Sequence, residues 1–236
     1  DGAYFHNTFT LTLDGAGALT GSPNFGAVVI TANTDANSNL SMESLTLTGV
    51  TLDMLTFALD VGSVGISGTG TLDASGGANV STAGGLTVES YSAGAGALTF
   101  DGAGAWTDSG TTTDYRAVVI DGATVTLGSD VDMTATTALE LKNSGTLALA
   151  GFNADVNGAL LLGSGVTAGV LDATTGGSSL NVSGAYTVED GSSVTSPGSL
   201  STVLDGALTL TDNTATPTNL GDVSVTAAVL LGSDVQ

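Results

Sequence analysis

The sequence predicts an all-β protein folded as a parallel β-helix, that is, a β-solenoid. Two observations predict it: the chain repeats itself, and its repeats consist of short segments in which apolar residues alternate with Thr. Alternation with a period of two, rich in β-branched residues, is typical of β-strands. Glycine occupies 35 positions and supplies the backbone angles that sharp corners between strands require. The chain therefore has the local features of short strands joined by tight corners.

Alternating segments occur along the whole chain, at residues 9–13, 44–48, 124–127 and 207–211. No segment of helical length shows an apolar stripe with a 3.6-residue period. Aromatic residues make up only 5% of the chain, so Val, Leu, Ile and Ala must fill the core. A core of such small residues favours narrow turns, for which we expect lengths of about 20–25 residues.

A longer repeat organises these segments. Residues 11–20 reappear as residues 98–107, and the run Ala-Val-Val-Ile follows each copy. The period, roughly 90–105 residues, also matches the size of an immunoglobulin domain, so tandem β-sandwich domains are the alternative fold. In the solenoid interpretation, one continuous solenoid has four parts: an N-terminal docking segment at 1–10, repeat 1 at 11–97, repeat 2 at 98–203 and a partial repeat 3 at 204–236.

The charge balance excludes several classes of function. There are 23 acidic residues against two basic ones, Arg116 and Lys142, and the net charge is −21. Binding to nucleic acids or to anionic membranes needs clustered Lys and Arg, so both are excluded. No apolar run approaches the ~20 residues that span a bilayer. The acidity serves either solubility or the binding of divalent cations.

Catalytic chemistry lacks its usual residues. The chain has no Cys and one His, His6, so zinc sites and His-centred triads are excluded. Paired carboxylates remain: Asp53 with Asp60, Glu189 with Asp190, and Asp130 with Asp132. We expect solvated acids and no enzymatic activity, because basic partners are so few. No cofactor is predicted.

Asp130 and Asp132 are the one pair for which we predict an ion. Residues two apart on a strand share a face, so these two carboxylates together can flank a sugar or hold a cation. Their oxygen atoms are ligands of the kind that calcium prefers. Calcium at Asp130 and Asp132 is therefore a specific expectation.

Short motifs carry a family resemblance. Residues 145–151, Gly-Thr-Leu-Ala-Leu-Ala-Gly, together with residues 70–74 and 85–88, resemble the Gly-Thr-Leu texture of bacterial autotransporter passengers and other repeat-rich microbial surface proteins and adhesins. The resemblance implies a right-handed parallel β-helix that is exported and displayed outside the cell. The chain starts at Asp1 without an initiator Met or signal peptide, so we expect a mature or excised segment located extracellularly or at the cell surface.

The two ends of a solenoid expose backbone and apolar groups unless they are covered. The head of this chain is aromatic and its tail is apolar and β-prone. We expect the head of one copy to dock on the tail of another, giving a structural subunit of an extracellular filament or cell-surface layer whose partners are copies of itself. The alternative is a monomeric adhesin or passenger rod that binds a cell or a glycan. The residues predicted to make the assembly contact are Tyr4, Phe5, Phe9, Val229, Leu230 and Leu231.

Overall fold

The structure is a computed structural model that describes residues 10–21, 24–110, 114–133, 138–164, 167–195, 200–206, 208–214, 218–226 and 229–231. Strands and connecting segments account for all the described residues, and none of these residues is helical. The chain divides into two compact units, unit 1 (Asp1–Tyr115) and unit 2 (Arg116–Gln236).

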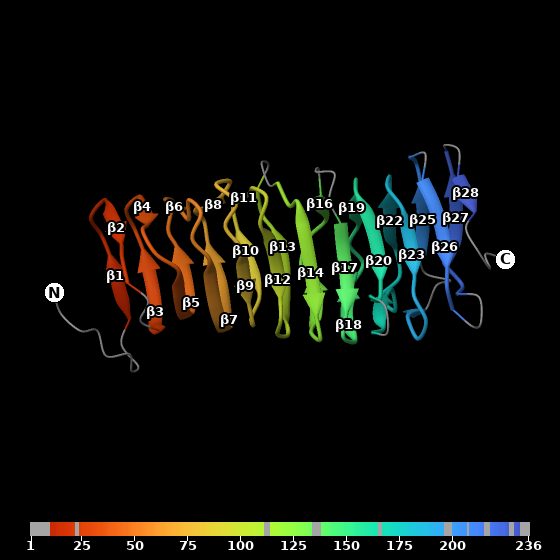
Figure 1. Ribbon diagram of the computed structural model, residues 1–236, viewed down its shortest axis with the longest axis horizontal. Helices are drawn as coiled ribbons and strands as arrows, with labels where there is room; N and C mark the ends of the chain where they lie inside the picture. The colour runs from red at the N-terminus through yellow and green to blue at the C-terminus, as the bar shows by residue number, and fades with distance from the viewer. Residues whose placement is uncertain are drawn as a thin grey trace. The chain divides into compact units, whose positions relative to one another are not determined.

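In unit 1 the strands stack in three rows, and each full turn of the chain passes through all three (Figure 1). Three long strands, β3 (Asn24–Ile30), β5 (Leu40–Leu47) and β7 (Leu59–Gly68), run through the first row and then the second. The remaining first-row strands are β9 (Val80–Thr82) and β12 (Ala97–Phe100). The second row also contains β1 (Leu11–Leu13), β10 (Leu86–Val88) and β13 (Gly104–Asp108). The third row contains β2 (Gly17–Leu19), β4 (Thr34–Ala36), β6 (Thr51–Asp53), β8 (Thr71–Ala74) and β11 (Ser90–Ala93).

Unit 2 by itself also has three rows of strands, and the chain again passes from the first row to the second and then the third. Its first row contains β14 (Ala117–Asp121), β17 (Ala138–Lys142), β20 (Ala159–Leu162), β23 (Tyr186–Val188), β26 (Leu208–Asp212) and β28 (Val229–Leu231). The second row contains β15 (Thr124–Leu127), β18 (Gly145–Ala148), β21 (Gly169–Asp172) and β24 (Ser193–Thr195). The third row contains β16 (Val131–Met133), β19 (Ala154–Val156), β22 (Ser178–Val182), β25 (Leu200–Leu204) and β27 (Asp222–Val225).

The strand pairing confirms the β-solenoid. Neighbouring strands within each row are parallel, as in the register Leu11↔Val28 and Val118↔Leu139. Tandem β-sandwiches, which are built from antiparallel sheets, are therefore the wrong alternative. Register partners lie 17 to 21 residues apart in unit 1 and 21 to 26 apart in unit 2, so the shortest turns are shorter than expected.

The apolar residues of the alternating segments form columns in the interior. In the second row of unit 1, Val28, Leu45, Ile66 and Leu86 follow one another in register, and none is more than 2% exposed. The residues between them along each strand, such as Thr46, point outward. Burial of one residue in two along these strands explains the apolar–Thr alternation.

Asparagine side chains join successive turns at the corners. The Oδ1 atom of Asn39 accepts a hydrogen bond from the backbone N of Ala58 at 3.0 Å, and Asn79 accepts one from Ala97 at the same distance. These bonds satisfy backbone N–H groups that the corners leave without a strand partner. Asn39 and Asn79 thus have a structural role at these corners.

Candidate functional site

The last described turn of unit 2 exposes residues that belong to interior columns. In the third row, Thr202 and Leu204 on β25 are fully buried, and their register partners on β27 are Val223 and Val225. Val223 is 44% exposed and Val225 is 53% exposed. The register places the side chains of Val223 and Val225 in the inward-facing columns. They are exposed because no described turn covers the end of these columns.

The first row shows the same change on β28. Leu231 is the register partner of buried Leu210, yet it is 59% exposed, and the outward Leu230 is 69% exposed. Val229 lies in the same strand, where its backbone pairs with Leu208. The structure therefore places three of the predicted assembly residues together on one strand. The other three, Tyr4, Phe5 and Phe9, lie outside the described residues.

The first described turn of unit 1 also exposes part of its interior columns, like the last described turn of unit 2. Leu11 and Leu13 on β1 are only partly buried, whereas Val28 and Ile30 in the next turn are fully buried. β2 is the terminal strand of the third-row sheet of unit 1, and β27 is the terminal strand of the third-row sheet of unit 2. Sequence reasoning missed β2 and β27, although the apolar–polar alternation of Val223 to Val225 was a signal for β27.

A buried acid at the end of β26 accepts hydrogen bonds from two later backbone N–H groups. Asp212 is the register partner of Val188, so it occupies an interior position. Its carboxylate accepts hydrogen bonds from the backbone N of Thr214 at 3.0 Å and from that of Thr218 at 2.6 Å. Because a buried carboxylate is costly without such donors, these bonds hold the backbones of Thr214 and Thr218 against Asp212.

Asp130 and Asp132 are exposed and lie on one side of the third row of unit 2. Asp130 precedes β16 and accepts a hydrogen bond from the backbone N of Asn153 at 2.8 Å; Asp132 accepts one from Asn157 Nδ2 at 3.4 Å. Among the described residues, no three His, Asp or Glu side chains are placed to hold a metal together. Calcium at this pair stays a prediction.

The turns after Asp132 add two further acids, which the sequence did not single out. Asp155 is the register partner of Asp132, and the Nδ2 of Asn181 donates to Asp155 at 3.2 Å and to Asp205 at 3.1 Å. Burial raises the pKa of Asp155, and the charges of Asp132 and Asp205 raise it further. Hydrogen bonds from Ser183 and Asn181 lower the pKa of Asp205. One amide therefore bridges two carboxylates of different acidity.

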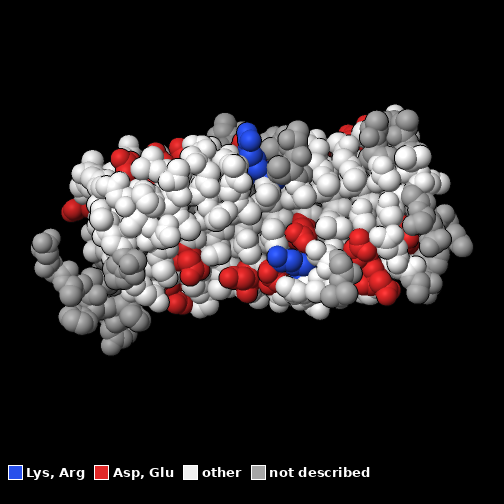
Figure 2. Space-filling model, in the orientation of Figure 1, with Lys and Arg blue, Asp and Glu red and all other residues white. Residues whose placement is uncertain are grey.

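Acids of the other two predicted pairs, Asp53 with Asp60 and Glu189 with Asp190, accept hydrogen bonds from polar side chains. Asp53 lies in the third row and Asp60 in the first, so the turn does not bring them into one row. Asp60 accepts a hydrogen bond from Ser81 at 3.0 Å, and Glu189 accepts one from Asn213 at 3.1 Å. His6 lies outside the described residues. Figure 2 shows carboxylates distributed over the drawn face of each unit in small groups.

Comparison with known proteins adds no relative. The chain matches no protein-family model, no curated protein and no solved structure. Within the described part of the chain, no helix is long and apolar enough to cross a membrane. The functional argument therefore rests on the geometry of the described turns.

Proposed function

We propose that this chain is a structural subunit of an extracellular filament or cell-surface layer that assembles end to end through copies of itself. The exposure of Val223 and Val225, whose column partners one turn earlier are fully buried, is the observation that carries the proposal. A further turn stacked on β27 would complete both columns. Another copy supplies such a turn with its own first described turn.

The shared row order of the two units specifies the contact. The third-row strand β27 of one copy pairs in parallel with the third-row strand β2 of the next. Continuing the columns places Val225 next to Leu19 inside the joint, and it places Ser224 next to Ala18 outside it. The same register puts Val223 beside Gly17, which has no side chain to obstruct it.

The energetics of such a joint favour extended assemblies. Full burial of a Val side chain stabilises by about 1.5–3 kcal/mol, so covering a half-exposed Val contributes roughly half of that. Backbone hydrogen bonds between β27 and β2 add directionality. The contact joins two different surfaces of the chain, so it need not close on itself and can repeat along a polymer. The net charge of −21 opposes assembly at low ionic strength.

Substitution of Val225 by Asp tests the proposal. A carboxylate buried in the joint has no partner there, so we expect Val225→Asp to abolish filaments or sheets in negative-stain electron microscopy. Sedimentation velocity should then show a single small species. The matched control is Val64→Asp, because Val64 is 69% exposed but lies on β7, away from the last described turn. Equal assembly of the two variants would contradict the proposal.

A monomeric rod that binds a cell or a glycan through its side is the second candidate. It is favoured if the unsubstituted chain forms discrete particles at all salt concentrations. A polar groove on the side of unit 1, lined by Thr51, Thr71 and Ser90 among other residues, is the structural feature that supports it.

A further inference from the structure

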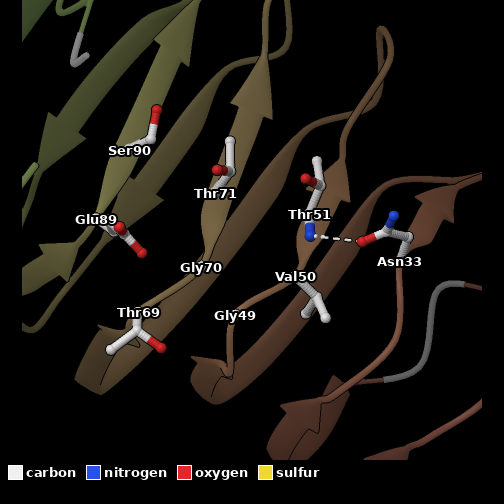
Figure 3. A pocket seen from close by; sticks show the side chains of 9 residues that line it. All are labelled: Asn33, Gly49, Val50, Thr51, Thr69, Gly70, Thr71, Glu89 and Ser90. Atoms are coloured by element: carbon white, nitrogen blue, oxygen red, sulfur yellow. Dashed lines mark hydrogen bonds between the residues drawn. The ribbon is translucent and has the colours of Figure 1, made fainter. Parts of the chain in front are cut away.

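A polar groove lies on unit 1 where the chain enters the strands of the third row (Figure 3). Its volume is about 320 Å³. The backbones of Gly49 and Gly70 form part of its lining, and neither has a side chain that would fill it. The groove spans four successive turns, so a ligand lying in it would follow the stacking direction of the strands.

One wall of the groove is a row of hydroxyl groups in register. Thr51 on β6 pairs with Thr71 on β8, which pairs with Ser90 on β11. Adjacent strands are about 4.7–4.9 Å apart, so these hydroxyls repeat at that interval. Asn33 extends the row by one turn: its Oδ1 accepts a hydrogen bond from the backbone N of Thr51 at 3.0 Å (Figure 3).

A row of carboxylates runs beside the hydroxyl row. Asp53 and Asp73 follow Thr51 and Thr71 by two residues, so they lie on the same outward side of the sheet. Asp35, Asp53 and Asp73 are register partners in three successive turns.

Local hydrogen bonds fix two of these acids. Oδ1 of Asp53 accepts a hydrogen bond from the backbone N of Leu55 at 2.8 Å, and Oδ1 of Asp73 accepts one from Ser75 at 2.9 Å. Each bond holds its carboxylate against the corner that follows the strand.

The electrostatics of unit 1 determine which ligands suit the groove. Arg116 and Lys142 are the only basic side chains of the protein apart from His6, and both lie in unit 2. Like charges in register on neighbouring strands repel one another. Glu89 places a carboxylate in the lining of the groove, whereas Asp53 and Asp73 lie beside that lining. A ligand with cationic groups at intervals would relieve this repulsion, and a ligand with hydroxyl groups would use the Thr and Ser row.

We propose that this groove binds a linear glycan that carries ammonium groups, with the sugar hydroxyls on Thr51, Thr71 and Ser90 and the ammonium groups on Asp53 and Asp73. The hydroxyl row selects a polyhydroxylated ligand over a simple polyamine. The carboxylate row selects an amino sugar over a neutral one. This proposal is independent of end-to-end assembly, because the groove lies on the side of unit 1.

Calorimetric titration at about pH 6, below the usual range of amine pKa values, tests the proposal. The probes are a glucosamine hexamer, an N-acetylglucosamine hexamer and spermine. We expect the glucosamine hexamer to bind more tightly than either of the others by about tenfold or more. If spermine bound as tightly as the glucosamine hexamer, charge alone would determine the affinity, and the glycan assignment would be overturned. Equal binding of the N-acetylated hexamer would overturn the role of the ammonium groups.

Variants locate the binding. The double substitution Asp53→Asn and Asp73→Asn removes both charges but keeps the Oδ1 acceptors of the corner bonds, so unit 1 should fold unchanged by circular dichroism. We expect it to weaken hexamer binding by about tenfold or more. Asp172→Asn is the matched control, because Asp172 makes the same corner bond, to Thr174 at 2.9 Å, in unit 2. Equal affinity of the double variant and the control would refute the assignment to this groove.

Discussion

Trp106→Ala is expected to lower the free energy of unfolding by about 3–5 kcal/mol, the range for truncation of a buried aromatic residue. Trp106 is 1% exposed and continues the interior column of Leu86. Its ring lies 5.4 Å from that of Phe100 and 5.1 Å from that of Tyr115, the latter edge-on. Truncation would remove both ring contacts and leave a cavity inside a narrow turn, where neighbours have little room to collapse.

Urea unfolding followed by far-UV circular dichroism measures this effect, since Trp106 is the sole tryptophan and its fluorescence is lost in the variant. Trp106→Phe retains an aromatic ring and should lose clearly less stability. Val64→Ala, at a side chain that is 69% exposed, should change stability by no more than about 0.5 kcal/mol. A loss below about 1 kcal/mol for Trp106→Ala would contradict a packed interior at this turn.

Gly68→Ala is expected to be nearly as damaging, by about 2–5 kcal/mol, for backbone reasons. Gly68 ends β7 with φ at +126°, which side-chain-bearing residues rarely adopt. A Cβ built there would lie 1.9 Å from the carbonyl oxygen of Leu47 on the neighbouring strand. Backbone atoms cannot move aside cheaply, because they belong to the strand ladder.

Gly15→Ala is the matched control for this substitution. A Cβ at Gly15 meets no atom within 4 Å. We expect its thermal unfolding midpoint to stay close to that of the unsubstituted chain, while that of Gly68→Ala falls by several degrees. Similar midpoints for the two variants would mean that the close approach of β5 and β7 at Leu47 and Gly68 is wrong.

Local patterns predicted the fold well because each strand carries its own signal. The alternation at residues 124–127 is β15, that at 44–48 falls mostly within β5, and that at 207–211 falls mostly within β26. Parallel stacking followed from the narrow, glycine-cornered turns. The stacking register did not, because corners of different length separate strands that look alike.

The long repeat illustrates this limit. Leu11 and Leu98 begin matching ten-residue runs, yet Leu11 lies in the second row and Leu98 in the first. The repeat therefore does not return to the same position within a turn.

The side groove could have been found only by comparing positions one turn apart. Thr51-Leu52-Asp53 and Thr71-Leu72-Asp73 are identical triplets separated by 20 residues, which is one turn of unit 1. Neither triplet alone is unusual. Likewise, the exposure of Val223 and Val225 depends on what covers the last described turn, a property that no local pattern contains.

Site-specific crosslinking tests end-to-end assembly most directly. The natural chain has no Cys, so the double variant Ala18→Cys and Ser224→Cys carries only the two thiols that the proposed β2–β27 joint places side by side. The matched control pairs Ala18→Cys with Val64→Cys. After mild oxidation, non-reducing gels of the first variant should show a ladder of multimers that collapses on reduction. A monomer band alone, or the same ladder from the control, would contradict assembly through this joint.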